Sequence, residues 1–156
     1  MSTFKEMAND FLAQKNLAVV GVSRAKDSVA NLIYKKLRDE EIQVYPINPN
    51  METFEGDKCY PDLKAVPVKP DGVFLMTRPE TTLQVVEECV DLGVERVWMH
   101  ENAFAGVANS SVSQEAVELC QANNIKVIAG GCPMMFLEFG HKCMRWIIGL
   151  MGKLPA

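Results

Sequence analysis

The sequence predicts an α/β protein with a single doubly wound parallel sheet of about five strands, helices on both faces and a C-terminal helix. Two observations predict this fold. Short apolar runs rich in β-branched residues alternate with longer segments of helical periodicity from residue 17 to residue 130. The 156 residues are enough for one such domain, and the chain contains no internal repeat and no low-complexity segment.

The N-terminal part of the chain alternates as this fold requires. Residues 3–14 carry apolar side chains at helical spacing, whereas 17–22 (LAVVGV) is an unbroken apolar run, typical of a strand covered on both faces. Residues 42–49 predict a second strand. Residues 28–40 predict a helix with Ser28 as its N-cap and an apolar stripe of Val29, Leu32, Ile33 and Leu37.

The remaining elements repeat the pattern. Strands are expected at 71–77, 95–101 and 125–130, and helices at 80–93 and 112–124. Parallel strands are joined by right-handed crossovers, and the whole is a Rossmann-like arrangement. We expect the strand order 3-2-1-4-5, with a ligand crevice at the carboxyl edge beside the first strand, where the order reverses.

Composition argues against several classes of protein. The formal net charge of −4 and the absence of a basic block argue against a nucleic-acid partner. Five cysteines without a C-x-x-C pair predict reduced thiols and a cytoplasmic location, and two histidines are too few for a common zinc site. The N-terminus lacks an apolar signal region, and no run approaches about 18 apolar residues, so no transmembrane segment is expected.

The turn after the first strand is a candidate phosphate site. Gly21 lets the chain turn tightly, Ser23 adds a hydroxyl, and Arg24 or Lys26 adds positive charge. Backbone N–H groups at the start of the following helix would face an anion above the strand. A simple turn glycine and a local serine cap would leave the same pattern, so both interpretations stay open at this point.

The loops after the second and third strands narrow the choice of ligand. An NAD-binding domain usually carries an acidic residue after its second strand, whereas residues 47–50 here read INPN. The chain also lacks G-x-G-x-x-G, a nearby arginine for NADP and the P-loop pattern. Thr77, Arg78 and Pro79 follow the third strand, where Arg78 would pair with phosphate and Pro79 would offer an apolar face. A solvated loop leading into a helix is the alternative.

These segments together resemble the CoA-binding domain family, and most closely its small stand-alone members. A well-known relative is the N-terminal domain of the succinyl-CoA synthetase alpha subunit. The resemblance implies a Rossmann-like domain that holds CoA in an extended form. The matching segments, in order, are AVVGVSR (18–24), VYPINPN (44–50), CYPDLKAVP (59–67), VFLMTRPETT (73–82), VWMHENAF (97–104) and GGCPMMFLE (130–138).

The resemblance also implies a set of cofactor-binding residues in three loops at one sheet edge: Gly21, Val22, Ser23 and Arg24 for phosphate, Pro49 and Asn50 for the nucleotide end, and Thr77, Arg78, Pro79 and Thr82 toward pantetheine. Two departures limit what is carried over. The synthetase members have a second glycine in the first turn, so the phosphate path stays open. Their chemistry needs a second domain with a phosphorylated histidine, which this chain is too short to hold.

Two positions near the carboxyl edge have more than one interpretation. Cys132 precedes a predicted helix start, where a lowered thiol pKa would allow a mixed disulfide with CoA, although packed cysteines are more common. His100 and Glu101 would form a general-base pair, but the spacing shows no nucleophile, so a contact or structural role is favoured. We therefore assign no catalytic residue and no metal ligand.

The last residues are expected to form a separate part. We divide the chain into a CoA-binding domain, 1–138, and a helical tail, 139–156, packed on the same domain or on a partner. A homodimer is one such arrangement, and contact with a membrane surface is another. The tail has an apolar stripe made of Met144, Ile147, Ile148 and Met151.

The sequence therefore predicts a cytoplasmic, homo-oligomeric protein that binds coenzyme A or a short acyl-CoA and catalyses no reaction alone. The first alternative is an NAD(P)-dependent oxidoreductase. The second is a protein-interaction module that acts through its C-terminal tail.

Overall fold

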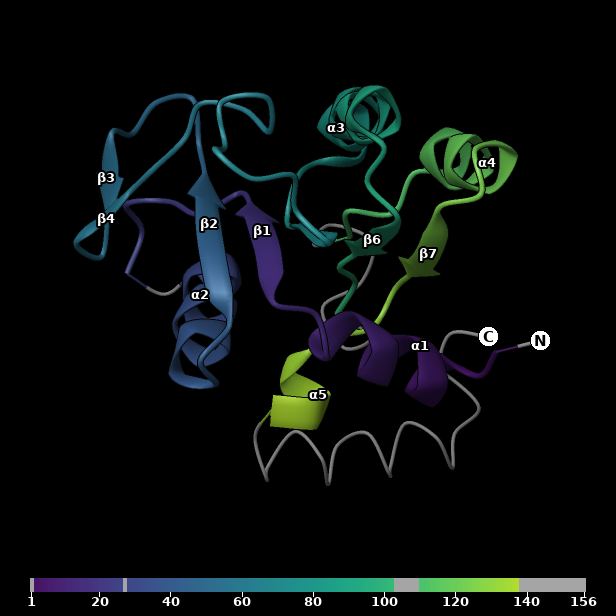
Figure 1. Ribbon diagram of the computed structural model, residues 1–156, viewed down its shortest axis with the longest axis horizontal. Helices are drawn as coiled ribbons and strands as arrows, with labels where there is room; N and C mark the ends of the chain where they lie inside the picture. The colour runs from purple at the N-terminus through teal and green to yellow at the C-terminus, as the bar shows by residue number, and fades with distance from the viewer. Residues whose placement is uncertain (1, 27, 103–109, 138–156) are drawn as a thin grey trace.

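The computed structural model describes residues 2–26, 28–102 and 110–137, and its centre is a five-stranded parallel sheet (Figure 1). All four strand pairings in this sheet are parallel. The prediction of one doubly wound α/β sheet is therefore confirmed. In the order in which they pair, the strands are β2 (Gln43–Ile47), β1 (Asn16–Val20), β5 (Gly72–Leu75), β6 (Arg96–Met99) and β7 (Lys126–Ala129).

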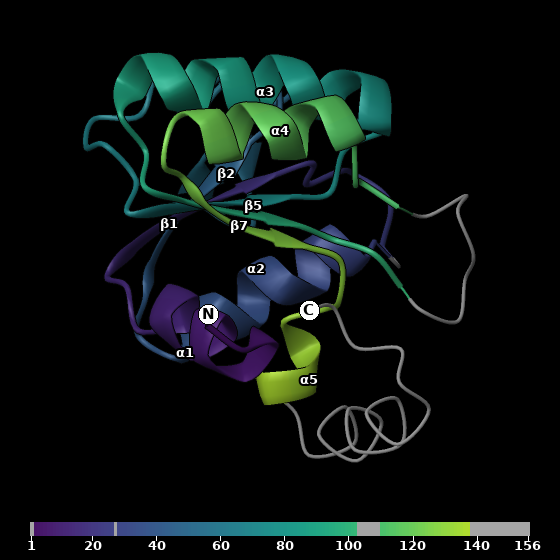
Figure 2. The same ribbon diagram turned by 90° about the vertical axis from the view of Figure 1, so that its right-hand side faces the viewer.

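Helices cover both faces of this sheet (Figure 2). One face carries α1 (Phe4–Leu12), α2 (Val29–Asp39) and the short α5 (Met134–Leu137). The other carries α3 (Pro79–Leu92) and α4 (Gln114–Ala122). None of the helices among the described residues is long and apolar enough to cross a membrane.

The strand order corrects the predicted 3-2-1-4-5. Counting the long strands along the chain, the sheet reads 2-1-3-4-5, because β5 pairs with β1 instead of lying beyond β2. The first crossover, α2, lies on one face, whereas residues 48–71 cross the opposite face, where Leu63 and Val66 join the core under α3. Right-handed crossovers on opposite faces move the chain in opposite directions along a sheet. The order therefore reverses between β1 and β5, and the crevice beside the first strand keeps its place.

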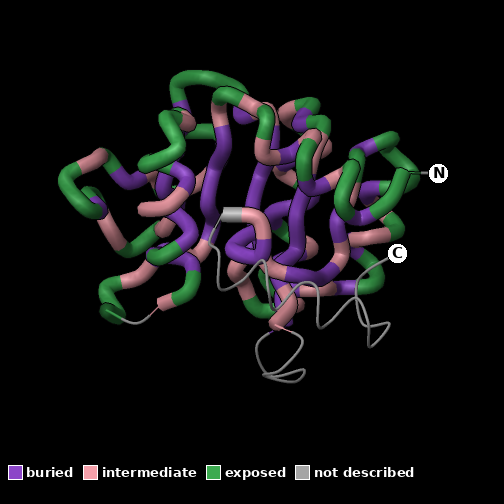
Figure 3. Tube along the Cα trace, turned by 90° about the horizontal axis from the view of Figure 1, so that it is seen from below, coloured by how far each residue is buried: buried purple, intermediate pink, exposed green. Residues whose placement is uncertain are grey.

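Two hydrophobic clusters flank the sheet and bury its central strands (Figure 3). Along β1, Leu17 and Val19 belong to the cluster under α1 and α2, while Ala18 and Val20 belong to the cluster under α3 and α4. This alternation explains why the strand reads as an unbroken apolar run. The first cluster is aromatic, and Trp98 at its centre is completely buried.

The buried face of α2 differs from the predicted stripe. Ile33 and Leu37 are buried as expected, but Val29 and Leu32 are 37% and 46% exposed. The helix is rotated so that Tyr34 packs edge to face on Phe54, with ring centroids 5.1 Å apart. Ser28 occupies the N-cap position, but its side chain makes no capping hydrogen bond.

Phe54 belongs to a small hairpin that the sequence did not predict. Strands β3 (Thr53–Phe54) and β4 (Asp57–Lys58) pair antiparallel between the second and third long strands, where the sequence predicts no element. The hairpin stands beside the carboxyl end of β2, and Tyr60 just after it bridges to Ile47. The predicted tail, 139–156, lies outside the described residues.

Candidate ligand-binding site

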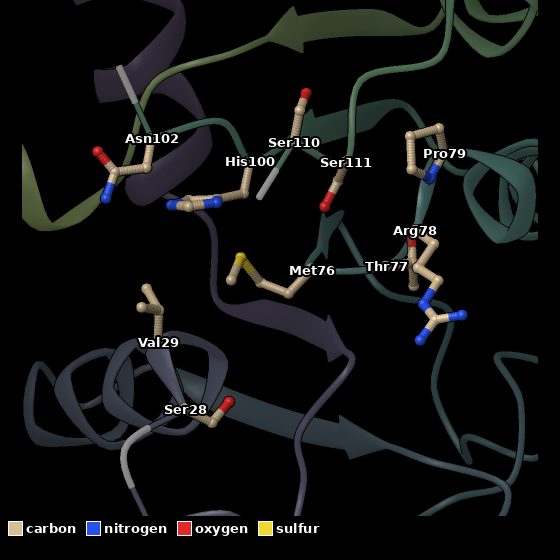
Figure 4. Close-up of a pocket in the computed structure, with 10 residues that line it drawn as sticks. All are labelled: Ser28, Val29, Met76, Thr77, Arg78, Pro79, His100, Asn102, Ser110 and Ser111. Carbon is tan, nitrogen blue, oxygen red and sulfur yellow. The ribbon is translucent and has the colours of Figure 1, made fainter. Parts of the chain in front are cut away.

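Two cavities open at the carboxyl edge of the sheet. The switch-point cavity has a volume of about 530 Å³ and lies at the ends of β5 and β6 (Figure 4). It is lined by the start of α2 at 28–29, by 76–79, by His100 and Asn102, and by 110–111. The hairpin cavity, of about 620 Å³, lies between the end of β2 and the β3–β4 hairpin. Because β1 pairs with both β2 and β5, the turn after β1 lies between the two cavities.

The glycine of this first turn is required by a close backbone approach. Gly21 has φ +111°, and its N–H donates to the carbonyl of Ile47 at 3.2 Å. A Cβ atom at this position would lie 2.4 Å from the carbonyl oxygen of Met76. Gly21 therefore lets the end of β1 fit between the ends of β2 and β5. A direct contact between Gly21 and phosphate remains a prediction.

Two asparagine side chains fix the turn that follows. The Asn31 Oδ1 accepts the Ser23 N–H at 2.9 Å, and its Nδ2 donates to the carbonyls of Ser23 and Ala25 at 2.7 and 2.9 Å. The Asn48 Nδ2 donates to the Val22 carbonyl at 2.7 Å. Sequence reasoning did not identify Asn31. The signal would have been that Asn31, a polar residue, shares the buried face of α2 with Tyr34. The sequence prediction placed this face incorrectly and therefore missed it.

The turn keeps two backbone donors available. Within the part of the chain that the structure describes, the N–H groups of Val22 and Arg24 donate to no other residue. The Val22 side chain is completely buried, so only its backbone can serve a ligand. The exposed Arg24 side chain donates from Nη2 to the Asn50 carbonyl at 3.2 Å. The turn is thus connected to the rim of the hairpin cavity and provides donors of the kind that bind anions.

The third loop presents hydroxyl groups and one arginine. Thr77, Arg78 and Pro79 line the switch-point cavity, and Arg78 is exposed. Among the described residues Arg78 forms no ion pair, so its charge is available to an anion. Thr82, another predicted residue, is completely buried behind this wall and does not line the cavity. Its hydroxyl lies 2.7 Å from both the Thr77 Oγ1 and the Ser111 carbonyl oxygen.

His100 forms part of the inner wall of the switch-point cavity. It is 2% exposed, its ring packs edge to face on Phe74, and its carbonyl accepts the Ser111 N–H at 2.7 Å. The Glu101 N–H donates to the Gly131 carbonyl, at an antiparallel bridge. His100 and Glu101 thus both make structural contacts through their backbones, and a contact role for their side chains stays a prediction.

Cys132 lies outside the lining of both cavities and packs against the aromatic cluster. Burial raises the pKa of its thiol to about 11. A thiol with this pKa is almost entirely protonated at neutral pH, so the geometry favours the packed interpretation over a reactive thiolate. In the described ranges, no three side chains of His, Cys, Asp or Glu are grouped to hold a metal ion.

The structure thus brings the three predicted loops to one edge of the sheet. Pro49 and Asn50 line the hairpin cavity, 77–79 lines the switch-point cavity, and 21–24 lies between them. The sequence did not predict several other wall residues, which reach the switch-point cavity from distant segments: Ser28, Val29, Met76, Asn102, Ser110 and Ser111. Nothing in their local sequence marks them, because the topology of the sheet brings them together.

A doubly wound sheet with a polar cavity at its switch point and available amides beside it is typical of proteins that bind nucleotide-containing ligands. The chain belongs to the CoA-binding domain family, whose model, described as "CoA binding domain", matches residues 15–138. The resemblance seen in the sequence is therefore confirmed.

Known proteins similar to this chain include both large ligases and a protein of its own size. The ADP-forming acetate–CoA ligase of Methanocaldococcus jannaschii is 29% identical over 118 residues, which are 76% of this chain and 17% of the ligase. A hypothetical protein from Pyrococcus horikoshii is 27% identical, with a TM-score of 0.76, over 87% of this chain and 92% of that one.

A third similar protein is the dinucleotide-forming acetyl-coenzyme A synthetase 1 of Candidatus Korarchaeum cryptofilum, solved with phosphate and ADP. It is 28% identical, with a TM-score of 0.64, over 74% of this chain and 25% of that chain. The chain spans less than a fifth of the length of the first two ligases it matches. It is therefore related to one domain of these enzymes.

Proposed function

We propose that this protein binds coenzyme A or a short acyl-CoA in the crevice at the carboxyl edge and acts as a binding or sensing module without catalysing a reaction alone. The nucleotide end would lie in the hairpin cavity against Pro49 and Asn50. The diphosphate would lie over the turn 21–24, and the pantetheine arm would enter the switch-point cavity along 77–79.

The observation that carries this proposal is the position of the first turn between two cavities. CoA has a nucleotide at one end, a flexible amide-containing arm at the other and a diphosphate in the middle. The available N–H groups of Val22 and Arg24 lie in the turn that separates the cavities, so the central anion would meet donors while each end of the ligand has a cavity of its own. Membership of the CoA-binding domain family supports the same ligand.

Positive side chains at the crevice support an anionic ligand, although the net charge of the whole chain is negative. The formal net charge is −4, which would repel an anion on average. Arg24 and Arg78, from the first and third loops, are exposed at the crevice, and Lys26 is exposed just beyond the turn. These positive charges would attract the phosphates of CoA, and the acidic residue that usually holds the ribose of NAD is absent from 47–50.

A thermal-shift panel of CoA, acetyl-CoA, NAD, NADP and ATP tests the proposal. A ligand present at one hundred times its dissociation constant stabilises the fold by about 2.7 kcal/mol. We expect CoA and acetyl-CoA to raise the melting temperature and NAD and NADP to leave it unchanged. A shift with NAD but not with CoA would favour the oxidoreductase instead.

Substitution of Arg78 tests where the ligand lies. We expect Arg78→Gln to weaken CoA binding about tenfold to a hundredfold, because a hydrogen bond between charged groups contributes about 1.5–3 kcal/mol. Lys5→Gln is the matched control, since Lys5 is exposed on α1, away from the crevice. Unchanged CoA affinity in the Arg78 variant, measured by titration calorimetry, would mean that Arg78 pairs with no phosphate of the ligand.

The proposed division into a domain, 1–138, and a tail, 139–156, is tested by removing the tail. We expect the shortened chain to keep its affinity for CoA. The protein-interaction module would be favoured by two results together: no ligand of the thermal-shift panel stabilises the protein, and deletion of 139–156 converts a dimer into a monomer.

A further inference from the structure

A buried hydroxyl group stands directly behind the wall of the switch-point cavity. The Thr82 side chain is completely buried, and its Oγ1 lies 2.7 Å from the Thr77 Oγ1, 2.7 Å from the Ser111 carbonyl oxygen and 3.2 Å from the Arg78 carbonyl oxygen. Thr77 and Ser111 both line the cavity, whereas Thr82 does not. One side chain on α3 therefore holds two wall residues that come from different loops.

The chemistry of these partners fixes the direction of the hydrogen bonds. A threonine hydroxyl has one proton to donate, and a carbonyl oxygen can only accept. Two of the three partners of the Thr82 hydroxyl are carbonyl oxygens, and the shorter of these two contacts is to Ser111. Thr82 therefore donates to the Ser111 carbonyl, and Thr77 must donate to Thr82. The Thr77 proton is then used inside the wall, and its hydroxyl can only accept a hydrogen bond from the cavity.

The Ser111 hydroxyl, also in the cavity wall, can donate a hydrogen bond to a ligand. Two hydrogen bonds fix the Ser111 backbone. Its carbonyl accepts from the Thr82 hydroxyl, and its N–H donates to the His100 carbonyl at 2.7 Å. The Ser111 side chain is nine-tenths buried or more, and its hydroxyl forms no hydrogen bond with another described residue. Figure 4 shows this oxygen directed into the cavity, so its proton is available to an acceptor there.

We infer that Thr82 is a positioning residue that makes the cavity wall complementary to secondary amides, with Thr77 accepting an amide N–H and Ser111 donating to an amide carbonyl. The inference rests on the proposed function, since it assigns this wall to the pantetheine arm of CoA, which contains two secondary amides. It adds that the wall selects the amide-containing arm, independently of the nucleotide. A ligand with an ether or alkyl chain in this place would leave buried polar groups without partners.

Paired substitutions at Thr82 test the inference. Thr82→Val has nearly the same shape but no hydroxyl, whereas Thr82→Ser keeps the hydroxyl and loses only a methyl group. Three ligands are titrated by calorimetry into each protein: CoA, pantetheine and adenosine 3′,5′-bisphosphate. We expect Thr82→Val to bind CoA and pantetheine about tenfold more weakly, the effect of losing about one hydrogen bond. Thr82→Ser should bind them as the native protein does, and the affinity for the bisphosphate should not change in either variant.

The outcomes separate this inference from the proposed function. Failure of the native protein to bind CoA would overturn both. Native binding of CoA together with undiminished binding by Thr82→Val would overturn the inference alone. An equal loss for the bisphosphate and for CoA would show general damage to the crevice and would also overturn it.

A second pair at the wall itself keeps the test decisive if Thr82→Val does not fold. Thr77→Val removes the proposed acceptor and should weaken CoA and pantetheine binding by a similar factor. Thr77→Ser should restore it. Equal affinities of Thr77→Val and Thr77→Ser for CoA would contradict the proposed recognition of the amide.

Discussion

The two sides of the crevice are held in different ways. On the switch-point side, Gly21 lies in backbone contact with Met76, and the buried neutral side chains of Asn31 and Thr82 make hydrogen bonds. On the hairpin side, an exposed carboxylate connects the hairpin to α2. Asp57 accepts hydrogen bonds from the Tyr34 hydroxyl and from the Arg38 Nη1.

This difference predicts how each side responds to change. Buried neutral hydrogen bonds and close backbone contacts are costly to break and insensitive to pH between about 5 and 9, because none of these groups titrates there. Exposed ion pairs contribute little and depend on the protonation of their carboxylates. The switch-point side should therefore set the stability of the site, and the hairpin side should adjust it with pH.

The largest effect is expected at the backbone contact of Gly21. Gly21→Val should lower the free energy of unfolding by about 3 kcal/mol or more, through strain at positive φ and the clash with the Met76 carbonyl. Gly56→Ala is the control, because Gly56 also has positive φ but nothing within 4 Å of the added Cβ, and it should cost about 1 kcal/mol. Chemical denaturation measures both, and equal losses would contradict the role of the contact.

A smaller effect is expected at the asparagine that holds the first turn. Asn31→Ala removes three hydrogen bonds to the turn and should lower the free energy of unfolding by about 2–3 kcal/mol. It should also weaken CoA binding, since the turn loses its fixed shape. Asn9→Ala, on the exposed side of α1, should change neither quantity appreciably. Native CoA affinity in the Asn31 variant would show that the turn does not need this support.

The hairpin side should contribute less and should depend on pH. The hydrogen bond from Tyr34, followed by the Arg38 contact, lowers the pKa of Asp57 below its usual range. A lowered folded-state pKa contributes stability that is present above the unfolded pKa and is lost as the pH falls through the folded one. Asp57→Asn should therefore cost less than about 1 kcal/mol at pH 7, given an exposed fraction of 47% for the carboxylate.

This loss should shrink as the pH falls below about 4, where the carboxyl group becomes protonated in the unfolded chain, and should disappear once the pH has fallen through the lowered pKa of the folded protein. Denaturation of both proteins at pH 7 and at pH 3 measures the change. Asp91, on α3, forms an exposed ion pair with Lys64. Asp91→Asn therefore serves as the control at a site away from the hairpin. A difference between native and Asp57→Asn proteins that grows in acid would reverse the assigned sign.

The smallest effect concerns Cys132. Because burial raises the pKa of its thiol to about 11, alkylation by iodoacetamide at pH 7.5 should be much slower in the folded protein than in the denatured one. Mass spectrometry of the peptide that contains Cys132 measures the rate. Rapid labelling of the folded protein would restore the hypothesis of a reactive thiol beside the crevice.

Several features of the fold could be read from local patterns. The unbroken apolar run at β1 predicts a strand covered on both faces, and the structure distributes its side chains between two clusters. The helix predicted at 80–93 agrees with α3, whose first residue is Pro79 and whose C-cap is Gly93, because proline fits the first turn of a helix and glycine adopts the left-handed conformation that ends one. The three loops of the site were recognised because the carboxyl ends of parallel strands share one edge.

Other features could not be read because they depend on contacts between distant segments. The strand order was wrong because the composition of residues 48–71 does not reveal which face of the sheet this connection crosses. The apolar stripe of α2 was misplaced because Tyr34 turns toward a hairpin that has no local signature. Asn31 and Ser111 reach the site only after the chain has folded, so their types alone gave no indication.

By itself, the sequence determined the alternation of strands and helices, the family and the three loops that meet at the sheet edge, because these follow from periodicity and from residue types at strand ends. Only the tertiary structure decided the order of the strands, the separation of the crevice into two cavities and the contacts of Thr82 with Thr77 and Ser111. The physical reason is that each of these depends on which distant backbone and side-chain groups come within hydrogen-bonding or van der Waals distance.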